Sequence, residues 1–157
     1  MAIISEPDLL IADEPTTALD VTIQAQILNL LRRIVRETNT SLLLITHDLA
    51  VVSEMCDKIG VMYAGQIVEW GEKRKVLREP KHPYTEALIA AIPDKRTEAG
   101  FMTIPGQPPK LTEIPNMCHF ADRCAYAEEA CRRSAIAYSL DEEGRGVRCL
   151  KPLSRSS

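Results

Sequence analysis

Two adjacent carboxylates follow a short apolar run near the start of the chain, and a proline comes directly after them. The run is residues 9–12, the acids are Asp13 and Glu14, and the proline is Pro15. Because proline cannot donate to a strand ladder, the strand must end at the acids, where open α/β sheets place their ligands. Neighbouring strand residues point to opposite faces, so one carboxylate could hold Mg²⁺ while the other orients or deprotonates an attacking water. The alternative is an ordinary strand end followed by an acidic turn.

A helix and a second strand must position these acids. Residues 21–38 have a helical apolar period, with Asp20 where an N-cap belongs, and residues 41–45 form a second apolar strand that ends just before His47. The apolar stripe of the helix is Ile23, Ile27, Leu30, Leu31 and Ile34. Both strands are continuously apolar, which predicts burial on both faces. A strand, a helix and a strand predict a parallel crossover, so we expect His47 near Glu14. By itself, a histidine after a strand is more often a polar loop residue.

These motifs together resemble an ATPase. Residues 9–20, LLIADEPTTALD, are similar to the Walker B element and D-loop of ATP-binding subunits of ABC importers of the oligopeptide/dipeptide type, and residues 46–48, THD, are similar to their H-loop. The resemblance implies that Asp13 organises Mg²⁺ and that Glu14 is the catalytic carboxylate. It also implies that Asp20 reaches toward the phosphate loop of a partner subunit and that His47 contacts the γ-phosphate of ATP.

Two elements of that family do not occur in the 157 residues. There is no Gly-x-x-x-x-Gly-Lys-[Ser/Thr] phosphate loop, since none of the seven glycines precedes a lysine, and there is no Leu-Ser-Gly-Gly-Gln signature. In the family both elements precede the Walker B strand, and residues 1–7 resemble the end of the signature helix. We therefore expect a C-terminal fragment that is not a competent ATPase alone.

Composition excludes several other classes. The net charge of −3 and the pI near 5.7 give no general attraction to nucleic acid, so no nucleic-acid partner is expected. The apolar runs are far shorter than the ~20 residues of a membrane helix. Acidic Glu6 and Asp8 near the start also argue against a signal peptide.

The second half of the chain changes character. Residues 59–71 predict a hairpin, residues 72–79 a short helix, and Pro83 the first turn of another helix. The proline-rich residues 93–116 predict a linker. The motifs HPYT and IPGQPP, which start at residues 82 and 104, resemble the C-terminal extension of oligopeptide/dipeptide-type subunits.

We therefore predict an α/β fold with two domains. Residues 1–75 are expected to be the C-terminal part of a P-loop NTPase sheet of the ABC type with flanking helices. Residues 76–157 are expected to be a small loop-rich extension that contains the cysteines.

Four of the five cysteines cluster near the end of the chain. They are Cys118, Cys124, Cys131 and Cys149. Without an export signal, a disulfide framework is not expected, and four thiolates in a loop-rich segment instead indicate a metal centre, either an iron–sulfur cluster or a Cys₄ zinc site. The absence of tight C-x2–4-C knuckles favours the cluster, and the family resemblance implies a [4Fe–4S] centre. The alternative is four buried thiols that only pack, which is also the assignment for Cys56.

The sequence thus predicts an ATP-binding and ATP-hydrolysing subunit, here a fragment, that powers peptide uptake by an ABC importer with ATP and Mg²⁺. The implied partners are a second ATP-binding subunit, membrane permease subunits and, indirectly, an extracytoplasmic peptide-binding protein. The implied location is the cytoplasmic face of a bacterial or archaeal membrane. The alternative function is a non-catalytic module for a metal cluster or for subunit docking. Inspection of the DNA upstream of the first codon for an in-frame phosphate loop discriminates between the two.

Overall fold

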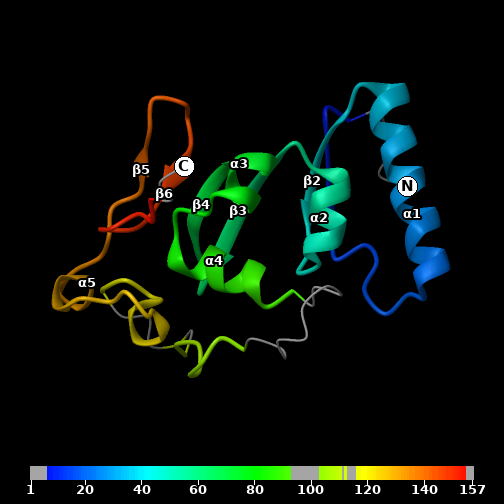
Figure 1. The fold of residues 1–157 in the computed structure, drawn as a ribbon. Helices are drawn as coiled ribbons and strands as arrows, with labels where there is room; N and C mark the ends of the chain where they lie inside the picture. Colours follow the sequence, from blue (N-terminus) through cyan, green and yellow to red (C-terminus); the bar gives the residue numbers. More distant parts are fainter. Residues whose placement is uncertain (1–6, 93–102, 111, 113–115, 155–157) are drawn as a thin grey trace. The chain divides into compact units, whose positions relative to one another are not determined.

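The chain forms two compact units, Met1–Cys56 and Asp57–Ser157, which are described separately (Figure 1). The computed structural model describes residues 7–92, 103–110, 112 and 116–154. The expected end of a signature helix therefore lies almost wholly outside the described residues, as does much of the expected linker. The two units do not test the predicted domain boundary at residue 75, which stays a prediction.

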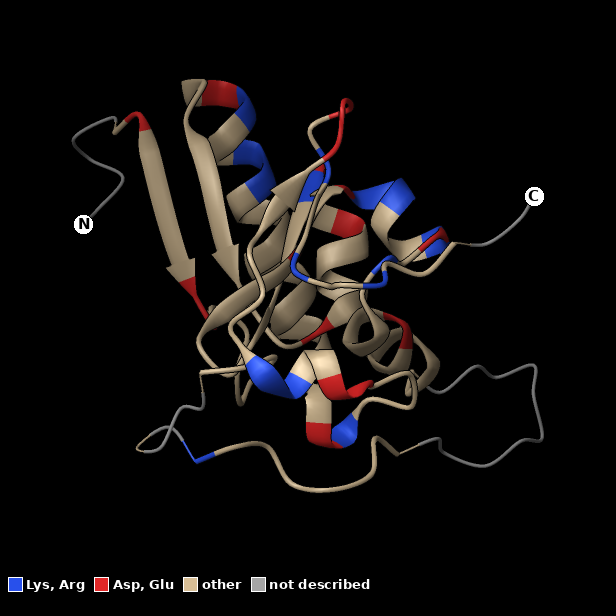
Figure 2. Ribbon diagram, turned by 90° about the vertical axis from the view of Figure 1, so that its left-hand side faces the viewer, with Lys and Arg blue, Asp and Glu red and all other residues tan. Residues whose placement is uncertain are grey.

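The first unit is a strand–helix–strand crossover followed by a short helix. Its elements are β1 (Leu9–Asp13), α1 (Val21–Thr38), β2 (Ser41–Ile45) and α2 (Leu49–Met55). Strands β1 and β2 pair in parallel, from Leu9 opposite Ser41 to Asp13 opposite Ile45. The predicted parallel pairing is confirmed, and it aligns the carboxyl ends of the two strands. In Figure 2, β1 and β2 are tan over most of their length and the chain turns red at the carboxyl end of β1.

Burial in the first unit differs from the expectation. Leu10, Leu28 and Leu31 are buried, whereas Ile11 and Leu43 are 58% and 48% exposed. Within the described residues, only one face of this two-stranded sheet is therefore covered, and the prediction that both strands are buried on both faces is wrong here. The predicted apolar stripe of α1 is borne out only in part. Leu31 is buried as expected, but Ile23 and Leu30 are exposed, and the other buried position is Leu28, which the stripe did not include.

Side-chain caps define the ends of the helices in this unit. The Asp20 carboxylate accepts a hydrogen bond of 2.9 Å from the backbone N–H of Ile23, which confirms the predicted N-cap of α1. Asn39 ends α1 in the left-handed region, with φ of 54°. Asp48 caps α2 by accepting from the backbone N–H groups of Ala50 and Val51.

The second unit is built on an antiparallel sheet of four strands in the order β3-β4-β6-β5. Its elements are β3 (Lys58–Tyr63), β4 (Gln66–Glu72), α3 (Lys73–Arg78), α4 (Pro83–Ala90), the 3₁₀ turn η1 (Ala121–Arg123), α5 (Glu129–Arg133), β5 (Ser139–Leu140) and β6 (Gly146–Val147). Ala64 and Gly65 join β3 to β4, and both have positive φ, as a two-residue hairpin turn of type I′ requires. The C-terminal β5–β6 hairpin extends the predicted β3–β4 hairpin into this sheet.

A buried carboxylate joins three parts of the second unit. The side chain of Glu69 in β4 is fully buried and accepts hydrogen bonds from the backbone N–H groups of Lys81 and His82, at 2.8 and 2.9 Å. It also accepts from the Arg145 guanidinium at 2.7 Å. The ion pair thereby fixes the start of α4 and the C-terminal hairpin to β4.

Among the described residues, none of the helices of either unit has the length and apolar content that crossing a bilayer requires.

Candidate functional site

An acid and a histidine meet at the carboxyl ends of the two parallel strands. The backbone N–H of Glu14 donates to the carbonyl of Ile45 at 2.9 Å, which extends the ladder one residue past β1. Glu14 has a φ of 47°, an uncommon left-handed conformation for a residue other than glycine. Its Oε1 lies 2.8 Å from Nδ1 of His47. The expectation that His47 lies near Glu14 is confirmed.

Hydrogen bonds to both carboxylate oxygens stabilise the charged form of Glu14. The Thr17 hydroxyl donates to Oε2, and this bond is the main cause of the lowered pKa of Glu14, followed by the contact with His47. The same contact with Glu14 raises the pKa of His47 above 6.5. The His47 side chain is 80% exposed, so we expect this ion pair to contribute little to stability. The contact between the two side chains can also break without a large change in their solvation.

The other two acids predicted for this site are placed differently. Asp13 is exposed at the last position of β1, opposite Ile45. Asp20 holds the N-terminus of α1 through its carboxylate. The structure therefore brings Glu14 and His47 into contact, and it uses Asp20 as a helix cap. The roles that the family resemblance assigns to these four residues stay predictions.

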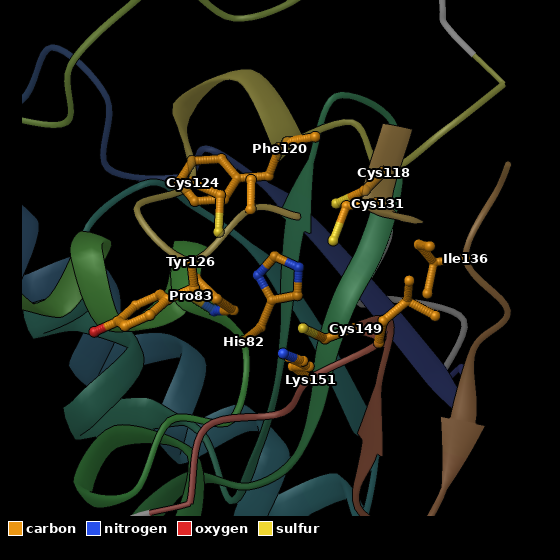
Figure 3. Close-up of a pocket in the computed structure, with 13 residues that line it drawn as sticks. His82, Pro83, Cys118, Phe120, Cys124, Tyr126, Cys131, Ile136, Cys149 and Lys151 are labelled. Carbon is orange, nitrogen blue, oxygen red and sulfur yellow. The ribbon is translucent and has the colours of Figure 1, made fainter. Parts of the chain in front are cut away.

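The four C-terminal cysteines all line one small cavity of about 20 Å³, which we call the cysteine pocket (Figure 3). The other residues around it are His82, Pro83, Phe120, Ala121, Tyr126, Ala127, Ile136, Leu150 and Lys151. Figure 3 shows sulfur atoms from separate segments of the chain turned toward the same space around the His82 ring. Burial raises the pKa of the Cys118 and Cys124 thiols, and it raises the pKa of Cys149 to about 11.

The donor set suits a thiolate-ligated centre, but the geometry does not suit a single ion. A zinc ion needs its ligands about 2.3 Å from one point. In the part of the chain that the structure describes, no three His, Cys, Asp or Glu side chains are arranged to hold one metal ion. Each cysteine of a [4Fe–4S] cluster binds a different iron, so its sulfurs need not converge so closely. A cavity of about 20 Å³ has room for about one water, so its walls would have to part around a cluster.

Sequence reasoning missed His82 as part of this pocket. Its side chain is 2% exposed, and its Nδ1 accepts a hydrogen bond of 3.0 Å from the backbone N–H of Tyr84. Burial lowers the pKa of His82 to about 4, so the ring is neutral at physiological pH. Neutral imidazole with an accepting Nδ1 carries its proton on Nε2. The HPYT motif marked the start of a helix but gave no sign of the cysteines beside it.

Arg123, next to Cys124, was also missed. Its guanidinium donates to the carbonyls of Ile104 and Pro105, at 2.9 and 2.8 Å, and to the Tyr63 hydroxyl at 3.2 Å. It therefore joins the described part of the proline-rich segment to the loop that carries two of the cysteines. Thr17 is a further omission, and a threonine three residues after an acid gives no distinct signal.

Comparison with known proteins gives two kinds of match. The family model described as "Oligopeptide/dipeptide transporter, C-terminal region" matches residues 68–131. The oligopeptide transport ATP-binding protein OppD of Salmonella typhimurium is 49% identical over 154 residues, which are 98% of this chain and 46% of that protein. The dipeptide transport ATP-binding protein DppD of Escherichia coli is 48% identical over 154 residues, which are 98% of this chain and 47% of that protein. The chain thus spans about half the length of these curated relatives.

Proposed function

The chain belongs to the family of ATP-binding subunits of oligopeptide and dipeptide ABC importers, and on that premise we propose that it carries the hydrolytic residues of such a subunit. The observation that carries the proposal is the 2.8 Å contact between Glu14 and His47 at the carboxyl ends of β1 and β2. In a complete subunit these residues would act on ATP to power the uptake of peptides.

Glu14 is proposed as the base. Its lowered pKa keeps the carboxylate ionised at neutral pH, so Oε1 or Oε2 can accept a hydrogen bond from a water molecule and orient it. In this structure both oxygens are already occupied, by Thr17 and His47. For one oxygen to bind water, His47 or Thr17 must turn away, and the exposed His47 ring is free to do so.

His47 is proposed as the group that contacts the terminal phosphate. Its raised pKa favours the protonated ring, which suits an anionic oxygen. If the His47 ring turned from Glu14 toward a phosphate, the same movement would free the Glu14 carboxylate. Asp13 is proposed to hold Mg²⁺, which would neutralise charge on the phosphates, and Asp20 is proposed to face the partner subunit.

The proposed partners follow from the same family membership. We propose that the complete subunit pairs with a second ATP-binding subunit and docks on membrane permease subunits, which receive peptide from an extracytoplasmic binding protein. It would then lie peripherally at the cytoplasmic face of the membrane.

We also propose that Cys118, Cys124, Cys131 and Cys149 hold a [4Fe–4S] cluster with a structural role. The support is that all four cysteines line one pocket. Because ligands must be thiolates, binding would release the protons that the raised thiol pKa values retain.

A hybrid subunit tests the hydrolytic role. It joins the N-terminal half of the Salmonella typhimurium OppD to this chain and is assembled with the remaining subunits of that importer. ATP hydrolysis is then measured for the hybrid and for His47→Ala, which we expect to lower turnover by roughly 10²-fold, the size typical of an acid–base or phosphate-contact group.

Glu37→Gln, an exposed change on α1, is the control and should hydrolyse ATP at the parent rate. If the hybrid assembles and folds but His47→Ala also hydrolyses at the parent rate, the role proposed for His47 is wrong.

A further inference from the structure

One face of the second sheet carries a row of residues that run across all four strands. Gly60 in β3 pairs with Trp70 in β4, Trp70 pairs with Gly146 in β6, and Gly146 pairs with Leu140 in β5. Directly paired residues share a face of the sheet. Trp70 and Leu140 are 39% and 65% exposed, so this face is open to solvent in the described structure.

The two glycines of the row make room for aromatic rings. A Cβ at Gly60 would lie 3.0 Å from the Trp70 indole, and a Cβ at Gly146 would overlap the hydroxyl end of Tyr138. Glycine inside a strand weakens it and often marks a close approach to the backbone. Here it allows the Trp70 and Tyr138 rings to lie against the sheet as an aromatic platform.

An open cavity of about 440 Å³, exposed to solvent along much of its extent, lies on this platform. Its lining residues are Ile67, Trp70, Tyr138, Leu140 and Arg148. Like small-molecule pockets, it is mostly apolar with a placed polar group. Arg148 is the one charged residue of the lining.

The Arg148 guanidinium is held in place before any ligand binds. Its Nε donates to the carbonyl of Ile67 at 3.2 Å, and its Nη1 donates to the carbonyl of Ile136 at 2.8 Å. The guanidinium carbon lies 5.6 Å from the centroid of the Tyr138 ring. These bonds use two of the five N–H donors of an arginine. A fixed guanidinium loses little entropy when it pairs with a carboxylate.

The nearby acids of the β5–β6 turn are in part neutralised by lysines. Asp141 pairs with Lys81 at 2.8 Å, and Glu143 pairs with Lys75. The positive charge of Arg148 therefore faces an otherwise apolar cavity. This charge selects for an anion, and the rings select for a flat apolar group.

We propose that this cavity binds a planar aromatic group that carries a carboxylate. The ring lies against Trp70 and Leu140, and the carboxylate accepts hydrogen bonds from Arg148. Such a group could belong to a free aromatic acid or to the C-terminal aromatic residue of a peptide. The site is independent of the hydrolytic role proposed above.

Trp70 is the only tryptophan of the chain and reports directly on the cavity. The 157-residue protein is titrated with 3-phenylpropanoate while Trp70 emission is recorded, and the neutral 3-phenylpropanamide is the control probe. We expect saturable changes with both, and about tenfold tighter binding of the carboxylate, the size of one hydrogen bond to a charged group. The peptide Ala-Ala-Phe with a free C-terminus identifies the source: tighter binding than 3-phenylpropanoate indicates a peptide end, and equal or weaker binding indicates a free acid.

Two variants test the assignment of the groups. Arg148→Gln should abolish the preference for the carboxylate, whereas Arg78→Gln, at an exposed arginine of α3, should retain it. Since Arg148 also bonds two carbonyls, Leu140→Asp is a second variant: this exposed position tolerates the change, and the added charge should weaken 3-phenylpropanoate at least tenfold. The proposal is overturned if neither carboxylate probe alters Trp70 emission, if the amide binds as tightly as the acid, or if folded Leu140→Asp binds 3-phenylpropanoate like the parent.

Discussion

Replacement of Arg145 by methionine should strongly destabilise the second unit. The Glu69 side chain is fully buried, and its carboxylate has Arg145 as its charged partner at 2.7 Å. Methionine fills similar space without the charge, so the substitution leaves a buried carboxylate that only backbone N–H groups satisfy. Removal of one partner of a buried ion pair typically costs about 3–5 kcal/mol, which is a large fraction of the stability of a small domain.

Urea denaturation followed by Trp70 fluorescence measures this effect, because Trp70 lies next to Glu69 in β4. The double change Glu69→Gln with Arg145→Met should recover part of the loss, since no buried charge then remains. Arg133→Met is the matched control. Arg133 pairs with Glu129 on the surface of α5, with side chains 69% and 79% exposed, so its loss should cost less than about 1 kcal/mol.

The reasoning fails if Arg145→Met lowers the free energy of unfolding by no more than Arg133→Met does. It also fails if the double variant is less stable than Arg145→Met alone. Either result would mean that backbone donors and water satisfy Glu69 without the guanidinium.

Three further predictions concern the first unit and the cysteines. The ¹H NMR titration of His47 should give a pKa above 6.5, and this pKa should fall toward 6.5 in Glu14→Gln. The stabilisation that the pair contributes should be fullest between pH 4.5 and 6.5. The contribution of His47 is lost as pH rises through its raised pKa, and that of Glu14 is lost as pH falls through its lowered pKa. Asp20→Ala should cost about 1 kcal/mol through loss of the α1 cap and should increase hydrogen exchange in the first turn of α1; unchanged exchange would contradict the cap. Protein made anaerobically with iron should contain about four irons per chain, and Cys124→Ser should lower this content whereas Cys56→Ser should not. One tightly bound zinc without iron would reject the cluster. No bound metal would mean that the four thiols only pack.

The first unit could be predicted from sequence because its signals are local. Continuous apolar runs of strand length located β1 and β2, and Asp20 marked the start of α1. A parallel crossover brings the carboxyl ends of its strands together, so the contact between Glu14 and His47 followed from topology. The prediction that both strands are buried on both faces was wrong. An apolar run shows that a strand can be buried, but it does not show that the described residues cover both of its faces.

The second unit depends on contacts that are distant in sequence. Strands β5 and β6 have two residues each, too few for an alternating pattern to be visible. Glu69 and Arg145 are 76 positions apart, and nothing near either residue signals that the two are buried together. The cysteines could be grouped by their types and spacing, but the presence of His82 among them depends on how α4 packs.

The most direct test of the central claim is the fate of ATP bound to the hybrid subunit when Glu14 is replaced by glutamine. The assembled Glu14→Gln transporter is mixed with radiolabelled ATP and Mg²⁺, and the bound nucleotide is separated after one turnover time of the parent. If Glu14 orients the attacking water, ATP binds with the parent affinity and stays intact, with ADP formed at least about 10²-fold more slowly. ADP formed at the parent rate would contradict the hydrolytic role of this chain.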